Sequence, residues 1–292
     1  MSRTVTRAVS AMRPGDHACF SFDHPSEQSS VVGGYVVNGL DRGERVVYLA
    51  EDRDSRVPGL NLRPGREQER YLDTGQLRVI PRSSVCGASG EYDPDLVMAV
   101  AGEELHRLAK DGYDAVRFSA DWSWALIRAR GEERLVRGES AADGAVGSSP
   151  VAMMLCHYDA ALCPRDALDK VHSCHNATAV SHARFDDGVL RLAPTFDPHG
   201  LRVEGEIDVA RHAAVTEALL ELSAMPGDLL VDLTGLRFID LRALRLLAEF
   251  PGLHRDAARL VLSNPPDFLV ETIRTVGDRL PADLVWAEGR GT

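Results

Sequence analysis

Lysine is almost absent from this sequence. Of its 33 basic residues only Lys110 and Lys170 are lysine, and they stand against 44 acidic residues, which leaves a formal net charge of −11. The chain also has no run of basic residues. Proteins that bind nucleic acid usually present a clustered basic surface. We therefore expect no nucleic-acid partner.

Long apolar runs are missing as well. No stretch reaches the roughly 20 apolar residues of a membrane helix, and residues 1–20 lack the apolar core of a secretory signal. The cysteines are odd in number and unevenly spaced, which does not fit a disulfide framework; they are Cys19, Cys86, Cys156, Cys163 and Cys174. These absences predict a reduced, cytoplasmic protein with no membrane partner.

What the first part of the chain does contain is an alternation of short apolar runs and amphipathic stretches. We expect strands at 17–22, 45–50, 77–80, 114–120 and 151–158. We expect helices at 26–43, 65–73, 93–112, 124 to about 138, and 164–175. This order predicts an α/β domain with a mainly parallel sheet. The Gly- and Ser-rich residues 138–150 are expected to be a loop within it.

A second unit is predicted from about residue 180, after a polar linker at 176–183. We expect a hairpin at 183–192 around an Asp-Gly turn, strands at 200–209, 228–233 and 258–263, and helices at 210–222 and 266–277. The stretch "FIDLRALRLL" (238–247) predicts a strand end, an Asp cap and the start of a further helix. The predicted domains are therefore residues 1–178 and a smaller α/β domain at 183–292.

The second unit resembles the STAS domain of anti-sigma factor antagonists over about residues 183–288. The resemblance is carried by "GEID" (205–208), "VDLTGL" (231–236) and "FID" (238–240) leading into a helix. It implies a protein partner, either an anti-sigma factor or a related kinase-like regulator, and partner switching in the regulation of transcription. The partner-binding residues that it implies are Asp240, Leu241, Arg242 and Ala243.

In that family an Asp-Ser-Ser/Thr-Gly motif opens the helix, and its first hydroxyl accepts a phosphate whose charge breaks the complex. Here Leu241, Arg242 and Ala243 occupy the last three positions, so no phosphorylation is expected at Leu241. Asp240 is expected to cap the helix. Leu241 either packs beside Leu244 or faces the partner, and both remain open.

The first unit resembles the MEDS domain, a sensory domain named after methanogens, methylotrophs and the regulator DcmR. The match lies in residues 15–52, "DWSW" (121–124), Glu139, "LCHYD" (155–159) and His175. It implies a degenerate RecA-like fold. An active version would carry a phosphate-binding loop after its first strand, but "FSFDHPSEQSSVV" (20–32) has no lysine and no glycine at the loop start. We expect no ATP hydrolysis and no cofactor.

Polar and aromatic residues gather near the strand ends of this predicted sheet. The ends after residues 22, 50, 120 and 158 should share the edge at which α/β sheets bind ligands, whereas His17 starts its strand at the opposite edge. We expect one of the two tryptophans in "DWSW" to pack in the core and the other to line a pocket. The candidate residues for binding a small-molecule ligand are His17, Cys19, Trp122, Trp124, Cys156, His157, Tyr158 and His175.

A metal or thiol sensor is a sharper form of this hypothesis, because His and Cys are natural ligands. However, the chain has no CxxC pair and no HExxH helix, so no metal site is predicted. Cys19 and Cys156 fit buried strand positions, where cysteine behaves as a small apolar residue.

Three functions stay open. The expected one is a non-enzymatic signalling protein, in which the sensory domain binds a small molecule and controls the STAS domain without phosphorylation. The alternatives are a thiol- or metal-dependent enzyme that uses Cys19 or Cys156, and an adaptor that binds no ligand. The sequence also leaves a homodimer open.

Overall fold

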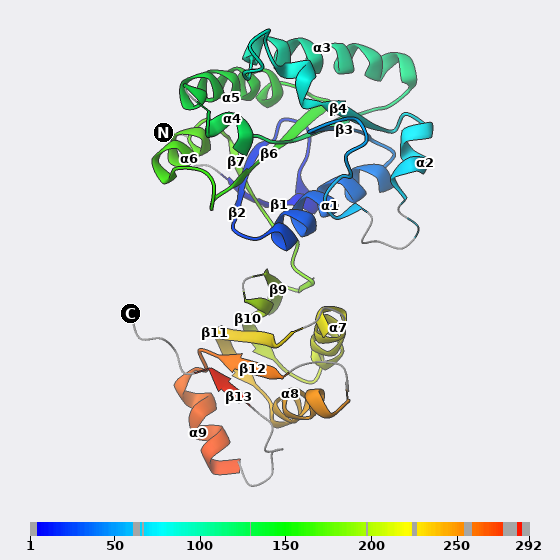
Figure 1. The fold of residues 1–292 in the computed structure, drawn as a ribbon. Coiled ribbons are helices and arrows are strands. Elements are labelled where there is room, and N and C mark those ends of the chain that lie inside the picture. Colours follow the sequence, from blue (N-terminus) through cyan, green and yellow to red (C-terminus); the bar gives the residue numbers. More distant parts are fainter. Residues whose placement is uncertain are drawn as a thin grey trace. The chain divides into compact units, whose positions relative to one another are not determined.

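The computed structural model describes residues 5–60, 65, 67–128, 130–196, 198–223, 227–253, 259–276 and 285–287. The chain divides between His182 and Ala183 into two compact units, each with its own sheet and helices (Figure 1). The predicted α/β class, with a parallel-sheet domain followed by a smaller α/β domain, is confirmed. Among the helices described, none is long and apolar enough to span a membrane.

The first unit is built on a seven-stranded sheet with the order β1-β7-β2-β6-β5-β3-β4, in which every described pair is parallel. The four central strands, β2, β6, β5 and β3, are buried on both faces, which explains their largely apolar sequences. The strands are β1 (Val5–Ala8), β2 (His17–Phe22), β3 (Arg45–Ala50), β4 (Leu77–Pro81), β5 (Val116–Asp121), β6 (Ala152–Asp159) and β7 (Ala177–Val180).

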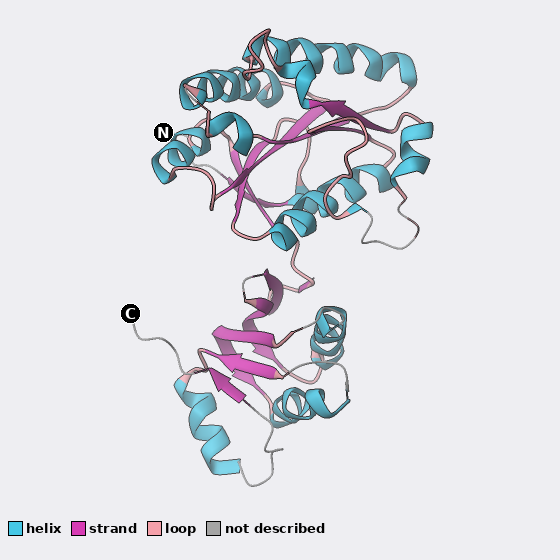
Figure 2. Cartoon of the chain, in the orientation of Figure 1, coloured by secondary structure: helices cyan, strands magenta, loops and turns pink. Residues whose placement is uncertain are grey.

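Helices cover both faces of this sheet (Figure 2). Apolar residues of α1 form one core with β2 and β3, while those of α5 and α6 form another with β5 and β6. The helices are α1 (Pro25–Asp41), α2 (Gln68–Asp73), α3 (Pro94–Asp111), α4 (Ser123–Leu126), α5 (Gly131–Gly147) and α6 (Arg165–His172), with short 3₁₀ turns at Val9–Ala11 and Arg82–Val85.

The predicted loop at 138–150 is wrong, because α5 continues through it to Gly147. The predicted single helix from 124 to 138 is also wrong, since α4 and α5 are separate. Leu135, Ala142 and Val146 recur at helical spacing on the buried face of α5. Small residues serve close packing here: a Cβ on Gly138 would meet the Tyr92 hydroxyl at 2.0 Å. Composition alone therefore misrepresented a packed helix as a loop.

The predicted linker at 176–183 is wrong over most of its length. Residues Ala177–Val180 form β7, which pairs with β1 on one side and β2 on the other. The sequence signal was weak because both β1 and β7 are only four residues long. The first unit consequently extends to His182 rather than to residue 178.

The second unit has a six-stranded sheet with the order β13-β12-β11-β10-β9-β8. β8, β9 and β10 pair antiparallel, and the other pairs are parallel. The strands are β8 (Phe185–Asp186), β9 (Leu190–Phe196), β10 (His199–Ile207), β11 (Leu229–Ile239), β12 (Leu260–Ser263) and β13 (Val285–Ala287), and the helices are α7 (His212–Ser223), α8 (Leu241–Leu253) and α9 (Asp267–Val276).

The predicted order of elements in this unit matches the structure, with two differences. β11 runs on to Ile239, six residues beyond the predicted strand, and β13 was not predicted. The predicted start of a strand at residue 258 and the predicted helix end at Gly277 lie outside the described residues. Buried leucines of α7 and α8 join those of β10 and β11 in one core.

Candidate functional site

A cavity of about 410 Å³ opens at the carboxyl edge of the first sheet. Glu51, Arg82 and Ser123, which follow β3, β4 and β5 in turn, line it together. Of the four strand ends expected at this edge, those after residues 50 and 120 line the cavity, at the edge where parallel sheets bind ligands. The ends after residues 22 and 158 pair with each other and do not line it. The loop after β3 contributes Arg56 and Pro58, and Ile127 and Leu162 supply apolar wall.

Polar groups at one wall of this cavity are held in a short chain of hydrogen bonds. The Gln28 amide donates to Asp121 Oδ2 (3.0 Å) and lies 3.3 Å from Nδ1 of His157. Asp121 Oδ1 accepts from the backbone N–H of Ser123 (2.9 Å). Burial lowers the pKa of His157 to about 4, although Asp121 opposes this. His157 is consequently a neutral imidazole behind the wall, and Asp121 presents the negative charge.

The two tryptophans behave differently, as expected. Trp122 is buried edge-on against Tyr92 (ring centroids 5.2 Å apart), whereas Trp124 lines the cavity. The Arg82 guanidinium lies over the Trp124 ring at 5.0 Å and reaches Glu51 at 3.2 Å. Trp122 directly follows β5 as the N-cap residue of α4, and Trp124 lies in the first turn of that helix. The cavity thus combines an aromatic surface with groups of both charges.

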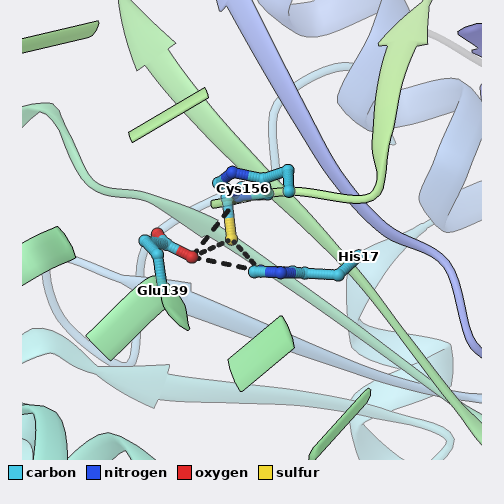
Figure 3. A group of neighbouring side chains, drawn as sticks. His17, Glu139 and Cys156 are labelled. Carbon is cyan, nitrogen blue, oxygen red and sulfur yellow. Dashed lines mark hydrogen bonds and ion pairs between the residues drawn. The ribbon is translucent and has the colours of Figure 1, made fainter. Parts of the chain in front are cut away.

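Three of the predicted residues, His17, Cys156 and His175, meet with Glu139 in a separate buried cluster. His17 at the start of β2, Cys156 in β6 and Glu139 in α5 point toward one another (Figure 3). His17 Nε2 lies 3.1 Å from Glu139 Oε2 and 3.5 Å from Cys156 Sγ, and Sγ lies 3.4 Å from Oε2. His175 Nε2 completes the group at 3.4 Å from Glu139 Oε2. We call these four residues the buried His/Glu/Cys cluster.

The far side of each polar group in this cluster faces a further partner. Tyr158 donates to Glu139 Oε1 (2.6 Å), and Nδ1 of His175 donates to the carbonyl oxygen of Val171 (2.8 Å). Nδ1 of His17 lies 3.5 Å from Asp143 Oδ1. The two imidazole rings stack with centroids 4.1 Å apart. Both rings are therefore oriented so that Nε2 faces the centre of the cluster.

Burial and charge act in opposite directions on the pKa values of the cluster. Burial would raise the pKa of Glu139, but His175 and His17 more than offset it and hold that pKa well below its usual range. Burial would lower the pKa of His17, yet Asp143 and Glu139 raise it overall. Burial and the Glu139 charge raise the pKa of Cys156 well above normal. A buried thiol with such a pKa is not poised as a nucleophile.

Cys19 lies outside the cluster even though it pairs in register with Cys156 on the neighbouring strand. Its thiol instead donates to the carbonyl oxygen of Ala177 (3.7 Å), and burial raises its pKa to about 11. The eight predicted residues therefore do not form one pocket. Trp124 lines the cavity with His157 behind its wall, and His17, Cys156 and His175 form the cluster with Tyr158 bonded to it. Cys19 and Trp122 belong to neither place. Gln28 and Arg82 carried no recognisable signal in the sequence, whereas Glu139 stood out through the MEDS resemblance.

The start of α8 in the second unit offers an exposed surface. Leu241 is 42% exposed and Phe238 is 47% exposed, and Arg242 is exposed beside them. Leu241 therefore faces outward and does not pack with the buried Leu244. Ala243 is only 1% exposed, so its predicted role in contacting a partner is wrong. Its position on α8 turns it toward the sheet.

Asp240 caps α8, as predicted. Its Oδ1 accepts from the N–H of Ala243 (2.7 Å), and both carboxylate oxygens lie 3.0 Å from Nε2 of His212. We expect Asp240→Ala to lower the free energy of unfolding of the second unit by about 1 kcal/mol, the usual loss for an N-cap. Asp240→Asn keeps the accepting oxygen and should cost less. Urea denaturation followed by circular dichroism measures both, and equal losses would contradict the capping role.

Comparison with known protein families gives a match for each of the two units. Residues 16–176 match the model of the MEDS family, the MEthanogen/methylotroph, DcmR Sensory domain. Residues 190–278 match the model described as Mlab, STAS domain. A search of curated proteins finds no match. Together, the two domain matches indicate a signalling or regulatory role.

Two solved structures resemble the chain at low identity. The KaiC-like protein of Pyrococcus horikoshii is 10% identical, with a TM-score of 0.40 over 70% of this chain and 89% of that chain. The flagellar accessory protein FlaH of Methanocaldococcus jannaschii is 12% identical, with a TM-score of 0.43 over 68% and 81%. Because the MEDS match spans more than half of the sequence, the chain belongs to the MEDS family, and a STAS domain follows its sensory domain.

Proposed function

We propose that this protein is a non-enzymatic signalling protein that binds a small molecule in the cavity at the carboxyl edge of the first sheet. The observation that supports this most directly is the cavity itself. It combines the Trp124 ring and apolar side chains with the Asp121 carboxylate and the Arg82 guanidinium. Ligand sites typically pair apolar walls with a few fixed polar groups. A ligand with an apolar body and a hydrogen-bond donor for Asp121 suits this arrangement.

The turn between β2 and α1 argues against a nucleotide as that ligand. A phosphate chain would need free N–H groups at the start of α1. Groups of His24 already occupy them: its Nδ1 accepts from the N–H of Ser26 (3.2 Å), and its carbonyl oxygen accepts from the N–H of Glu27 (2.9 Å). The Glu27 carboxylate also places negative charge at this position. A neutral or cationic molecule is therefore the better fit.

Native mass spectrometry of the purified protein tests the ligand proposal. We expect a small-molecule adduct on the wild type, and at least a tenfold smaller adduct fraction on Trp124→Ala, because the aromatic wall is lost. Arg130→Ala, a change at an exposed side chain of the same unit, is the control and should keep the adduct. Absence of any adduct, together with no thermal shift from a library of small neutral and cationic molecules, would favour the adaptor without a ligand.

We further propose that the STAS domain binds an anti-sigma factor or related kinase-like regulator through the exposed surface of Phe238, Leu241 and Arg242. The STAS match and the exposure of two large apolar side chains support this. Without a hydroxyl at position 241, ligand binding in the first unit takes the place of phosphorylation as the control. A ligand can do so only if it binds one state of the protein more tightly than another.

Leu241→Asp tests whether this surface binds the partner. Acidic residues in the first turn favour a helix, so the change should leave α8 folded while it places a charge in an apolar contact. We expect the Kd for the anti-sigma factor to rise at least about tenfold, as for a central interface residue. Leu220→Asp, near the C-terminal end of α7, is the control and should change the Kd by less than twofold. Equal effects of the two changes would exclude this surface.

The same complex tests the absence of phosphorylation. After incubation of the wild type with the partner and ATP, we expect the intact mass to stay unchanged, because residue 241 carries no hydroxyl. Leu241→Ser supplies the acceptor and serves as the positive comparison. Phosphate found by peptide mapping anywhere in residues 183–292 of the wild type would contradict control by ligand binding alone.

A further inference from the structure

We propose that the buried His/Glu/Cys cluster binds one divalent transition-metal ion, with zinc as the best match. The ligands would be Nε2 of His17, an oxygen of Glu139, Sγ of Cys156 and Nε2 of His175. One ligand atom from each of these residues lies within 4.8 Å of all the others. No metal site was predicted because the sequence has no metal-binding motif with close spacing along the chain. These four residues are brought together only by the fold.

The spacing of the ligand atoms suits tetrahedral coordination. Zinc binds nitrogen and oxygen at about 2.0–2.2 Å and sulfur at about 2.3 Å, so neighbouring ligand atoms of a tetrahedron lie about 3.3–3.6 Å apart. Four of the six pairs of ligand atoms are 3.1, 3.4, 3.4 and 3.5 Å apart, and the other two pairs lie within 4.8 Å. An ion at the centre would therefore need only small side-chain movements.

The outer contacts provide an independent argument. Metal-binding histidines usually donate their second ring N–H to a carboxylate or a backbone carbonyl. His175 does so to Val171 O at 2.8 Å, and His17 Nδ1 lies 3.5 Å from the Asp143 carboxylate. Each Nε2 then directs a lone pair toward the centre. Without an ion or an added proton, these lone pairs would face the Glu139 carboxylate, an unfavourable arrangement.

Charge balance leads to the same conclusion. Within the described part of the chain, no arginine or lysine forms an ion pair with Glu139, whose charge is fully buried. Its partners are the imidazoles of His17 and His175 and the hydroxyl of Tyr158, and a buried carboxylate is costly unless its charge is balanced. A divalent cation would neutralise Glu139 and the Cys156 thiolate together while both imidazoles remain neutral. Binding would release the thiol proton and any proton on the imidazoles.

Four protein ligands leave no open position, so the site would be structural and not catalytic. Its ligands come from β2, α5, β6 and the residues that precede β7. The ion would therefore tie α5 and the end of the α6 segment to the centre of the sheet. This proposal does not depend on a ligand in the carboxyl-edge cavity.

Metal reconstitution of the full chain tests the site. Protein stripped with a chelator and dialysed against Zn²⁺ should hold one zinc per chain by elemental mass spectrometry. Co²⁺ should add the near-ultraviolet thiolate-to-cobalt band and the strong visible bands of tetrahedral coordination. We expect Cys156→Ala to lose the thiolate band and to bind Zn²⁺ at least about 100-fold more weakly. His175→Ala should weaken Zn²⁺ similarly but keep the thiolate band.

Cys19→Ala is the matched control, since Cys19 is equally buried on the adjacent strand and its thiol lies outside the cluster. It should keep one zinc and an unchanged cobalt spectrum, with circular dichroism confirming that all variants fold. Two results would overturn the proposal. One is a folded wild type that takes up neither ion at micromolar concentration; the other is equal metal binding by the Cys156→Ala and Cys19→Ala variants.

Discussion

Replacing Glu44 by alanine is expected to lower the free energy of unfolding of the first unit by about 3–5 kcal/mol, as for other broken buried ion pairs. Glu44 pairs with Nε of Arg117, whose side chain is fully buried in the sheet. Asn38 and the backbone oxygen of Tyr35 accept from the same guanidinium at 2.9 and 3.2 Å. These neutral acceptors would remain, but they cannot balance the Arg117 charge.

Urea denaturation measures this loss, with the fluorescence of Trp122 and Trp124 followed in a Trp286→Phe background so that the first unit alone is reported. Glu133→Ala is the matched control, because it breaks the exposed pair with Arg130 and should cost less than about 1 kcal/mol. The double change Arg117→Met with Glu44→Leu should recover most of the stability, since apolar replacements remove both charges. Similar losses for Glu44→Ala and Glu133→Ala would show that Arg117 does not depend on its partner.

Gly59→Ala is the second change with a large expected effect, and it bears on the cavity. Gly59 adopts φ +75°, and a Cβ there would lie 1.8 Å from the backbone oxygen of Ser29 in α1. In the other direction, a Cβ on Gly33 would meet Gly59 Cα at 2.8 Å. The absence of a side chain at Gly33 and Gly59 therefore lets the loop after β3 pack directly against the backbone of α1. It carries Arg56 and Pro58 of the cavity wall.

A left-handed backbone conformation alone costs a non-glycine residue about 1–2 kcal/mol. We expect Gly59→Ala to lower the free energy of unfolding by more than this amount. It should also reduce the fraction of protein that carries the adduct in native mass spectrometry. Gly43→Ala separates the two causes. Gly43 has nearly the same φ, +72°, but a Cβ added there would meet no atom within 4 Å, so only the backbone cost applies. Equal losses of stability, or an adduct that survives Gly59→Ala unchanged, would show that the glycine contact does not shape the cavity.

The two candidate sites of the first unit are linked by one strand. Cys156 and His157 are consecutive in β6, so their side chains point to opposite faces of the sheet. Cys156 enters the buried His/Glu/Cys cluster, while His157 stands behind the Gln28 and Asp121 wall of the cavity. An ion that holds Cys156 would also restrain β6 beneath the cavity. Metal removal should therefore weaken ligand binding if both proposals are correct.

Much of the fold was predictable because its signals are local. The buried strands β2, β3 and β6 are mainly apolar, and α1 and α3 begin with proline just inside the helix. The Asp240 cap was also predictable, since it joins residues only three apart. Errors arose where packing overrode composition. In α5, Gly138 packs closely against Tyr92, and the four residues of β7 are held in a strand by pairing with β1 and β2.

The sequence by itself determined the two families, the loss of the phosphate-binding loop and of the phosphoacceptor, and the residue types available for chemistry. Only the tertiary structure decided which of those residues meet. His17 and Cys156 are 139 residues apart, yet β2 lies beside β6 in the sheet, and α5 brings Glu139 over both. Cys19 carries the same thiol and is left out, because its thiol turns to the carbonyl of Ala177. Which strands lie side by side depends on contacts between distant parts of the chain, such as the pairing of β2 with β6, and no local pattern in the sequence encodes it.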